Sequence, residues 1–123
     1  MQNIGVADAP LVTDAHDMVL LLKEIVNGMH VSEKIRALML EKPSMYNVNA
    51  QLSYGLGVFK QNIDGTMVYH HGGEEPGYSS ANIYIPQSDT SLTLLFNYGG
   101  FEACETRVDG VIQTVLKTFL QNK

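Results

Sequence analysis

The residues most capable of chemistry lie in one stretch, where two histidines are followed by glycines, glutamates and a Pro-Gly pair at residues 70–77. Imidazole can bind a metal ion or exchange a proton near neutral pH. Adjacent residues of a strand point to opposite faces of a sheet, so His70 and His71 cannot ligate one ion together. The other two histidines, His16 and His30, lie far away in the sequence and show no helical pairing. We therefore expect no metal site and no other cofactor.

The glycines and glutamates of the same stretch suggest two further kinds of site. A phosphate-binding loop would need a Lys-Ser or Lys-Thr pair, which residues 72–77 lack, and Glu74 and Glu75 would repel phosphate. The two carboxylates could act as an acid and a base, although adjacent carboxylates are usually solvated. Cys104 has no histidine near it in the sequence, and its glutamate neighbours disfavour the reactive thiolate. None of these patterns alone defines an active site.

The composition favours one globular domain over residues 1–123 and excludes several classes of protein. Thirteen acidic and eight basic residues give a net charge of -5 with no basic stripe, so we expect no nucleic-acid partner. The single cysteine excludes an internal disulfide. The chain has no apolar run long enough to span a membrane and no signal-peptide pattern at Met1, so we expect neither. The sequence is compatible with either a cytoplasmic or an exported protein.

Two helices are expected in the first third of the chain. The first begins at a cap, Thr13 or Asp14, and carries an apolar stripe to a left-handed stop at Asn27-Gly28. Ser32 caps a shorter helix that runs through Met39.

A third helix is expected at the end of the chain. Its apolar residues recur every three or four positions, which is the spacing of one helical stripe. They are Val108, Val111, Ile112, Val115, Leu116, Phe119 and Leu120. This stripe predicts that the helix covers one face of a sheet with Phe119 in the core.

The middle of the chain is rich in strand patterns separated by turns. Strands are expected at residues 54–61, 66–71, 80–85 and 91–97, with an Asp-Gly turn at 62–65, a Gly/Pro loop at 72–77 and a polar loop at 44–53. The expected fold class is α+β, with N-terminal helices, a three- to four-stranded antiparallel sheet and a C-terminal helix packed on the sheet.

Several short motifs follow one another along the chain. The first third contains Gly5-Val6-Ala7, Thr13-Asp14-Ala15-His16-Asp17 and Asn27-Gly28. The rest contains Tyr54-Gly55-Leu56-Gly57, His71-Gly72-Gly73, Pro76-Gly77-Tyr78-Ser79-Ser80, Ile85-Pro86 and Leu94-Leu95-Phe96-Asn97. In order and spacing they resemble the serine β-lactamases and penicillin-binding-protein-like hydrolases, a group that includes class C β-lactamases, D-alanyl-D-alanine carboxypeptidases and esterases. The match covers nearly all of this chain but only the C-terminal part of that family's catalytic domain, and it implies a bacterial source.

The resemblance implies roles for the residues of the third family motif. His71-Gly72-Gly73 corresponds to the Lys/His-x-Gly triplet on the strand that edges the cleft, where the first residue gives polar or positive character near the substrate. The two glycines leave the strand bare for a substrate. Glu74 would offer its backbone N–H to the oxyanion hole. Pro76, Gly77 and Tyr78 would shape the turn at the edge of the cleft.

The family's nucleophile is missing from this sequence. It belongs to a Ser-x-x-Lys motif, and no serine here has a lysine three positions later. Ser80-Ala81-Asn82 spells the second family motif but follows the third, so we interpret it as coincidental. The hypothesis is a C-terminal portion of a hydrolase for a β-lactam, a D-alanyl peptide or an ester, inactive alone. The alternative is a free-standing, non-catalytic α+β binding module.

The resemblance also has a consequence for association. In the resembled fold, the strand at residues 91–97 is flanked by strands from the N-terminal part of the domain, and this sequence lacks them. The strand carries no charge or proline that would protect an edge. Besides a small-molecule substrate, the expected partner is therefore the missing part of the domain or a second copy, in a homodimer that pairs residues 91–97.

Overall fold

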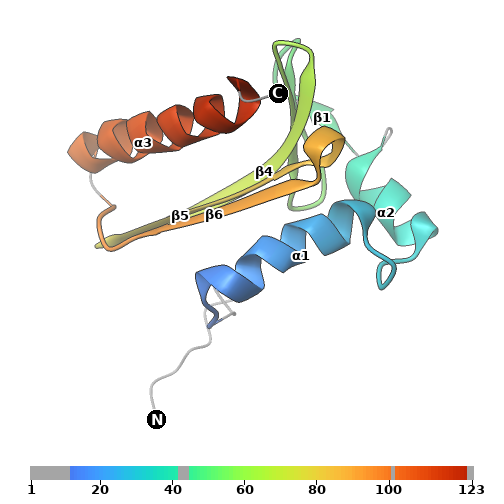
Figure 1. Cartoon of the computed structure of the whole chain (residues 1–123), viewed down its shortest axis with the longest axis horizontal. Coiled ribbons are helices and arrows are strands. Elements are labelled where there is room, and N and C mark those ends of the chain that lie inside the picture. The colour runs from blue at the N-terminus through green and yellow to red at the C-terminus, as the bar shows by residue number, and fades with distance from the viewer. Residues whose placement is uncertain (1–11, 42–44, 101, 122–123) are drawn as a thin grey trace.

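The computed structural model describes residues 12–41, 45–100 and 102–121, with side chains from residue 105 onward in the last range. Residues 5–7, quoted for the family resemblance, and the Cys104 side chain lie outside this description. The predicted α+β class is confirmed, and one antiparallel sheet follows the order of the sequence (Figure 1). Its strands are β1 (Tyr46–Asn47), β2 (Leu52–Tyr54), β3 (Phe59–Ile63), β4 (Thr66–Glu75), β5 (Tyr78–Ile85) and β6 (Thr90–Phe96).

The sheet has six strands among the described residues, so the prediction of three to four was wrong. Two short strands lie where a polar loop was expected, because β1 pairs with β2 across Tyr46 and Tyr54. The strand expected at 54–61 is divided between β2 and β3. Gly55 and Gly57 lie in this break, and Gly57 has a φ of +79°, which interrupts an extended strand.

The helices lie on both faces of the sheet, with α3 on one side and α1 on the other (Figure 1). Their bounds are α1 (Ala15–Asn27), α2 (Glu33–Leu40) and α3 (Glu102–Gln121), and a short 3-10 helix, η1 (Pro86–Ser88), precedes β6. In the part of the chain described, no helix is long and apolar enough to cross a membrane.

The predicted helix caps are confirmed at the N-termini but not at Gly28. The Asp14 carboxylate accepts a hydrogen bond from the Asp17 N–H at 3.0 Å, and the Ser32 hydroxyl accepts one from the Ile35 N–H at 3.4 Å. Gly28 has a φ of -80°, so α1 ends in extended backbone and not in the predicted left-handed stop. A side chain at Gly28 would collide with the Glu24 carboxylate, which folds back to accept a hydrogen bond from the His30 N–H.

The core between α3 and the sheet is narrower than the sequence predicts. Val68, Ile83, Ile85 and Leu116 are buried together, and Ile112 and Leu120 pack against them. Phe119 is 44% exposed, so its predicted place in the core was wrong. The reason is the geometry of the helix. Residues four apart, from Val108 to Leu120, lie on one face of α3 and contact the sheet, whereas Phe119 lies at the side of that face.

The core between α1 and the sheet ends in a polar cluster. Leu22 packs with Val58 and the ring of Tyr84, which is fully buried. The Tyr84 hydroxyl donates to Asp89 Oδ1 at 3.1 Å and accepts a hydrogen bond from Asn27 Nδ2 at 3.4 Å.

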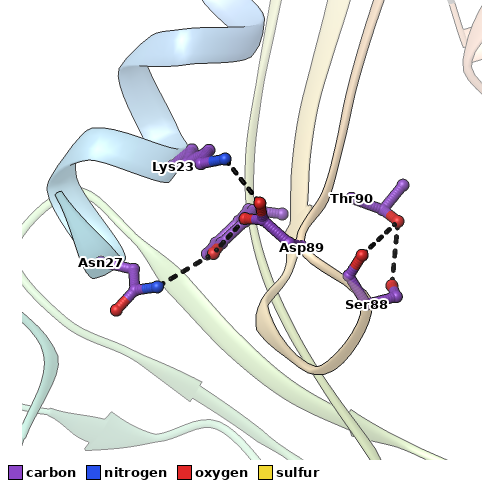
Figure 2. Close-up of polar contacts among 6 residues, drawn as sticks. Lys23, Asn27, Ser88, Asp89 and Thr90 are labelled. Atoms are coloured by element: carbon purple, nitrogen blue, oxygen red, sulfur yellow. Dashed lines mark hydrogen bonds and ion pairs between the residues drawn. The ribbon is translucent and has the colours of Figure 1, made fainter.

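Asp89 also pairs with Lys23 of α1, with 2.7 Å between Nζ and Oδ2 (Figure 2). The hydrogen bonds from Lys23 and then Tyr84 lower the pKa of the Asp89 carboxyl from its ordinary value. These contacts fix the C-terminal half of α1 to the turn between β5 and β6, and so orient α1 over the sheet.

Two tight turns set the register of the central strands. The Asp64-Gly65 turn between β3 and β4 is confirmed, with φ values of +50° and +85° that suit a two-residue hairpin. The loop expected at 72–77 was wrong, because β4 continues to Glu75 and only Pro76 and Gly77 remain as the turn. The reason is pairing: the register with β5 continues without a break from Tyr69–Tyr84 to Glu75–Tyr78. Gly77 has a φ of +88°, which favours glycine there.

Candidate functional site

The second half of β4 has an open edge. Strand β3 pairs with β4 only from Thr66 to His70, whereas β5 pairs with it through Glu75. Within the described residues, no strand pairs with the other edge of residues 71–75. Unpaired backbone N–H and C=O groups at a strand edge can hydrogen-bond an extended ligand. This edge begins at His71-Gly72-Gly73, the triplet that the sequence singles out.

A cavity of about 630 Å³ adjoins this edge. Its lining includes the predicted residues His71, Gly72, Gly73, Glu74 and Tyr78. Thr13 and Met18 of the α1 region also line it, together with Leu95 and Phe96 at the end of β6. The structure therefore brings the predicted third-motif residues to one cavity, and it adds residues from both ends of the chain that the sequence did not indicate.

Alternation along β4 divides the motif between the two faces of the sheet. His71, Gly73 and Glu75 share one face, while His70, Gly72 and Glu74 belong to the other. The two histidines therefore point apart, as the sequence predicted for adjacent strand residues. In the described part of the chain, no group of three or more His, Cys, Asp or Glu side chains could hold a metal ion.

His71 lies at the mouth of the cavity among aromatic rings. It is exposed, and its Nε2 lies 3.4 Å from the Tyr54 hydroxyl. The Phe59 ring lies 5.9 Å from it between centroids. These contacts leave the imidazole accessible to a ligand while limiting its rotation.

His70 has a structural environment on the opposite face. Its ring stacks on Phe59 with 5.2 Å between centroids, and its Nε2 lies 3.1 Å from Gln61 Oε1. Burial, followed by the charge of neighbouring His71, lowers the pKa of the His70 imidazole. His70 therefore packs against Phe59 and Gln61 on the face of the sheet opposite to His71.

Asn82 and Ser80 line the same cavity, although the order of the motifs indicates that the Ser80-Ala81-Asn82 triplet is coincidental. Asn82 lies directly opposite His71 in the register of β4 and β5. Its Oδ1 accepts a hydrogen bond from the Thr93 hydroxyl of β6 at 2.9 Å. Residues 80–85 are predicted as a strand, and alternation along a strand places Ser80 and Asn82 on one face.

The turn at the end of the cleft is fixed by the loop that precedes α3. The Glu74 carboxylate accepts a hydrogen bond from the Gly100 N–H at 2.8 Å, and the Gly77 N–H donates to the Gly99 carbonyl at 3.0 Å. The buried Ser79 hydroxyl donates to the Tyr98 carbonyl at 2.9 Å. Glu74 therefore has a positioning role for its side chain. The role of its backbone N–H in an oxyanion hole stays a prediction.

The two glycines of the motif differ in their surroundings. A Cβ at Gly72 would lie 2.9 Å from the Ser80 carbonyl oxygen of the neighbouring strand, so Gly72 is required by packing. A Cβ at Gly73 would meet only the Ser80 hydroxyl at 3.2 Å, on the face that borders the cavity. Gly73 therefore keeps the cleft face bare, whereas Gly72 preserves the strand pairing behind it.

A second hollow, of about 460 Å³, lies between α3 and the sheet. Its lining combines the apolar core residues Val68 and Leu116 with the polar side chains of His70, Asp109 and Gln113. It adjoins the cleft, because seven residues line both hollows: His71, Gly72, Gly73, Glu74, Ser79, Ser80 and Asn82.

Comparisons with known proteins place this fold. No family model matches the chain, and no curated protein matches it. Among solved structures, a D-stereospecific amidohydrolase from Streptomyces sp. is similar with a TM-score of 0.59 and 24% identity, over 69% of this chain and 25% of its own. A penicillin binding protein from Bacillus halodurans is similar with a TM-score of 0.63 and 22% identity, over 82% of this chain and 30% of its own.

A D-amino acid amidase from Ochrobactrum anthropi SV3, solved with D-phenylalanine, is similar with a TM-score of 0.62 and 19% identity, over 86% of this chain and 37% of its own. At these identities the likeness shows the fold alone. The chain has a fold related to that of the serine β-lactamase and penicillin-binding-protein class, and it spans between 25% and 37% of the length of these three structures.

Proposed function

We propose that this chain is the C-terminal portion of a β-lactamase-related serine hydrolase, with residues 1–123 belonging to one catalytic domain. In this assignment, His71-Gly72-Gly73 is the third motif at the edge of the substrate cleft. The observation that carries the proposal is the open edge of β4, because it begins at this triplet and borders a cavity. The related fold of the three hydrolase-class structures supports it.

The chain supplies the substrate-positioning half of an acyl-transfer site. Residues 71–75 would hold a substrate amide, ester or β-lactam along the strand edge, and the Glu74 N–H would donate to the oxyanion of the tetrahedral intermediate. The Ser79 hydroxyl donates a hydrogen bond to the Tyr98 carbonyl, so it is not positioned to act as the nucleophile. The nucleophile and its base would come from a Ser-x-x-Lys segment outside this sequence.

Because acyl transfer begins with a nucleophile, the isolated chain should be inactive. We expect no hydrolysis of nitrocefin or p-nitrophenyl esters above background. A fluorophosphonate should add no mass to the protein, and the same reagent should label a serine hydrolase used as the positive control. Covalent labelling of any serine in the isolated chain would contradict the assignment of the nucleophile to missing sequence.

A further inference from the structure

The hollow of about 460 Å³ between α3 and the sheet is another concave site in this structure. The residues that it shares with the cleft all belong to β4 and β5, which form a single layer between the two spaces. The residues that line the hollow alone belong to α3 or to the face of the sheet that α3 covers (Figure 1). The hollow therefore extends toward α3, whereas the cleft extends toward Thr13 and Met18 of the α1 region.

Small residues on the sheet create this hollow. Toward the C-terminal half of α3, Val68 and Ile83 fill the space beneath the helix by packing against Leu116. Further along β4 and β5, the cross-strand pair is Gly72 and Ala81, whose side chains are too small to reach the helix. Because protein interiors are otherwise close-packed, this unfilled space is one that a ligand can enter.

His70 gives the hollow a hydrogen-bond acceptor. Its Nε2 lies 3.1 Å from Gln61 Oε1, which can only accept, so Nε2 carries the proton. Burial lowers the pKa of the imidazole, so the ring is neutral near pH 7 and its Nδ1 is an acceptor. Among the described residues, none donates a hydrogen bond to Nδ1. Stacking on Phe59 fixes the ring, so this acceptor is held in place for a donor on a ligand.

The remaining lining combines apolar surface with negative charge. Ile83, Ile112 and Leu116 contribute apolar surface from the sheet and from α3. Glu105 and Asp109 lie one turn apart on α3, and both are exposed, so they belong to the rim of the hollow. Among the described residues of the lining, none is lysine or arginine. A negatively charged ligand would therefore be repelled at the rim, whereas a cation would be attracted.

We propose that this hollow is a binding site for a small aromatic ring that carries a planar N–H donor, with His70 Nδ1 as the acceptor. The carboxylates at the rim favour a cationic donor, such as an amidinium, over a neutral one and over an anion. A rigid ring suits the apolar surface because it loses little conformational freedom on binding. The inference goes beyond the proposed function and does not depend on it.

The test uses three probes of nearly one shape and different charge: benzamidine, benzamide and benzoate. Each is titrated into the full chain near neutral pH while NMR follows the backbone amides. Ala81 and Gln113 report on the hollow alone, whereas Tyr78 and Phe96 report on the cleft alone. We expect saturable shifts at Ala81 and Gln113, with benzamidine binding most tightly, benzamide less tightly and benzoate least.

Three variants connect this order to the lining. His70→Phe removes the acceptor but keeps a ring on Phe59, and it should weaken both benzamidine and benzamide by about two- to tenfold. Asp109→Asn should weaken benzamidine alone, by about fivefold at most, because the carboxylate is exposed. Glu33→Gln removes one charge from an exposed position on α2 and should change neither affinity. Circular dichroism checks that each variant is folded.

Several outcomes would overturn the inference. Shifts confined to Tyr78 and Phe96 would place the probes in the cleft, and the absence of saturable shifts at Ala81 and Gln113 would exclude the site. Benzoate binding as tightly as benzamidine would contradict the charge preference, and an unchanged benzamide affinity in folded His70→Phe would contradict the role of the imidazole. None of these results bears on the proposed hydrolase function, which depends on a nucleophile outside this sequence.

Discussion

Truncation of Leu116 tests how α3 packs on the sheet. Leu116 is 5% exposed and lies in the cluster with Val68, Ile83 and Ile85. A buried Leu→Ala change costs about 2–5 kcal/mol in the free energy of unfolding. Leu116 also borders the 460 Å³ hollow, so it has open space on one side. We therefore expect a loss near the lower end of that range, about 2–3 kcal/mol.

Two neighbours on the same helix serve as controls. Phe119 is 44% exposed, so Phe119→Ala should remove roughly half of a full burial term, about 1 kcal/mol. Lys117 is exposed, and Lys117→Ala should be nearly neutral, within about 0.5 kcal/mol.

Urea denaturation followed by circular dichroism measures all three variants. With an m-value of about 1–3 kcal/mol/M, the loss of about 2–3 kcal/mol in Leu116→Ala should lower the urea midpoint by about 0.7–3 M. A larger loss for Phe119→Ala than for Leu116→Ala would show that the buried face of α3 has been assigned incorrectly.

Three further predictions concern the cleft, the buried histidine and the edge strand. Gly72→Ala should cost about 1–3 kcal/mol by urea denaturation, because its Cβ meets a backbone carbonyl, whereas Gly73→Ala should cost clearly less. The folded-state pKa of His70 lies below its unfolded value, so its stabilising contribution is present above about pH 6.5 and declines as the pH falls toward the folded pKa. His70→Gln should flatten the pH dependence of stability there, and an unchanged slope would refute this assignment. Light scattering should detect a dimer through β6, the outermost described strand on its side of the sheet, and Leu95→Lys should weaken it; a monomer at high micromolar concentration would exclude this dimer.

The parts of the fold that the sequence predicted correctly depend on local chemistry. Asp14 and Ser32 have side chains suited to helix caps, and Asp64-Gly65 has the residues that a two-residue hairpin requires. Ile83 and Tyr84 are neighbours in the segment predicted as a strand at 80–85, so they lie on opposite faces and pack in different clusters. In each case the decisive interaction lies within a few residues of the pattern.

The structural predictions that were wrong concern residues whose structure depends on partners far away in the sequence. Residues 72–75 have loop-like composition, and only their pairing with β5 makes them a strand. The apolar stripe of α3 is wider than the surface it covers, so Phe119 remains on the flank. The candidate site also combines local and distant contributions. The sequence motif identified His71, whereas tertiary packing brings Met18 and Asn82 to the cavity.

The most direct test of the proposed function is mass spectrometry of the natural gene product after fluorophosphonate treatment. The account predicts a product larger than the 13.6 kDa of this sequence, with the label on a serine that precedes a lysine by three positions and lies outside residues 1–123. His71→Ala in that longer protein should reduce labelling of the serine without unfolding the protein. Two results would contradict this proposal. One is a natural protein of the size of this sequence that takes up no label, and the other is a label within residues 1–123.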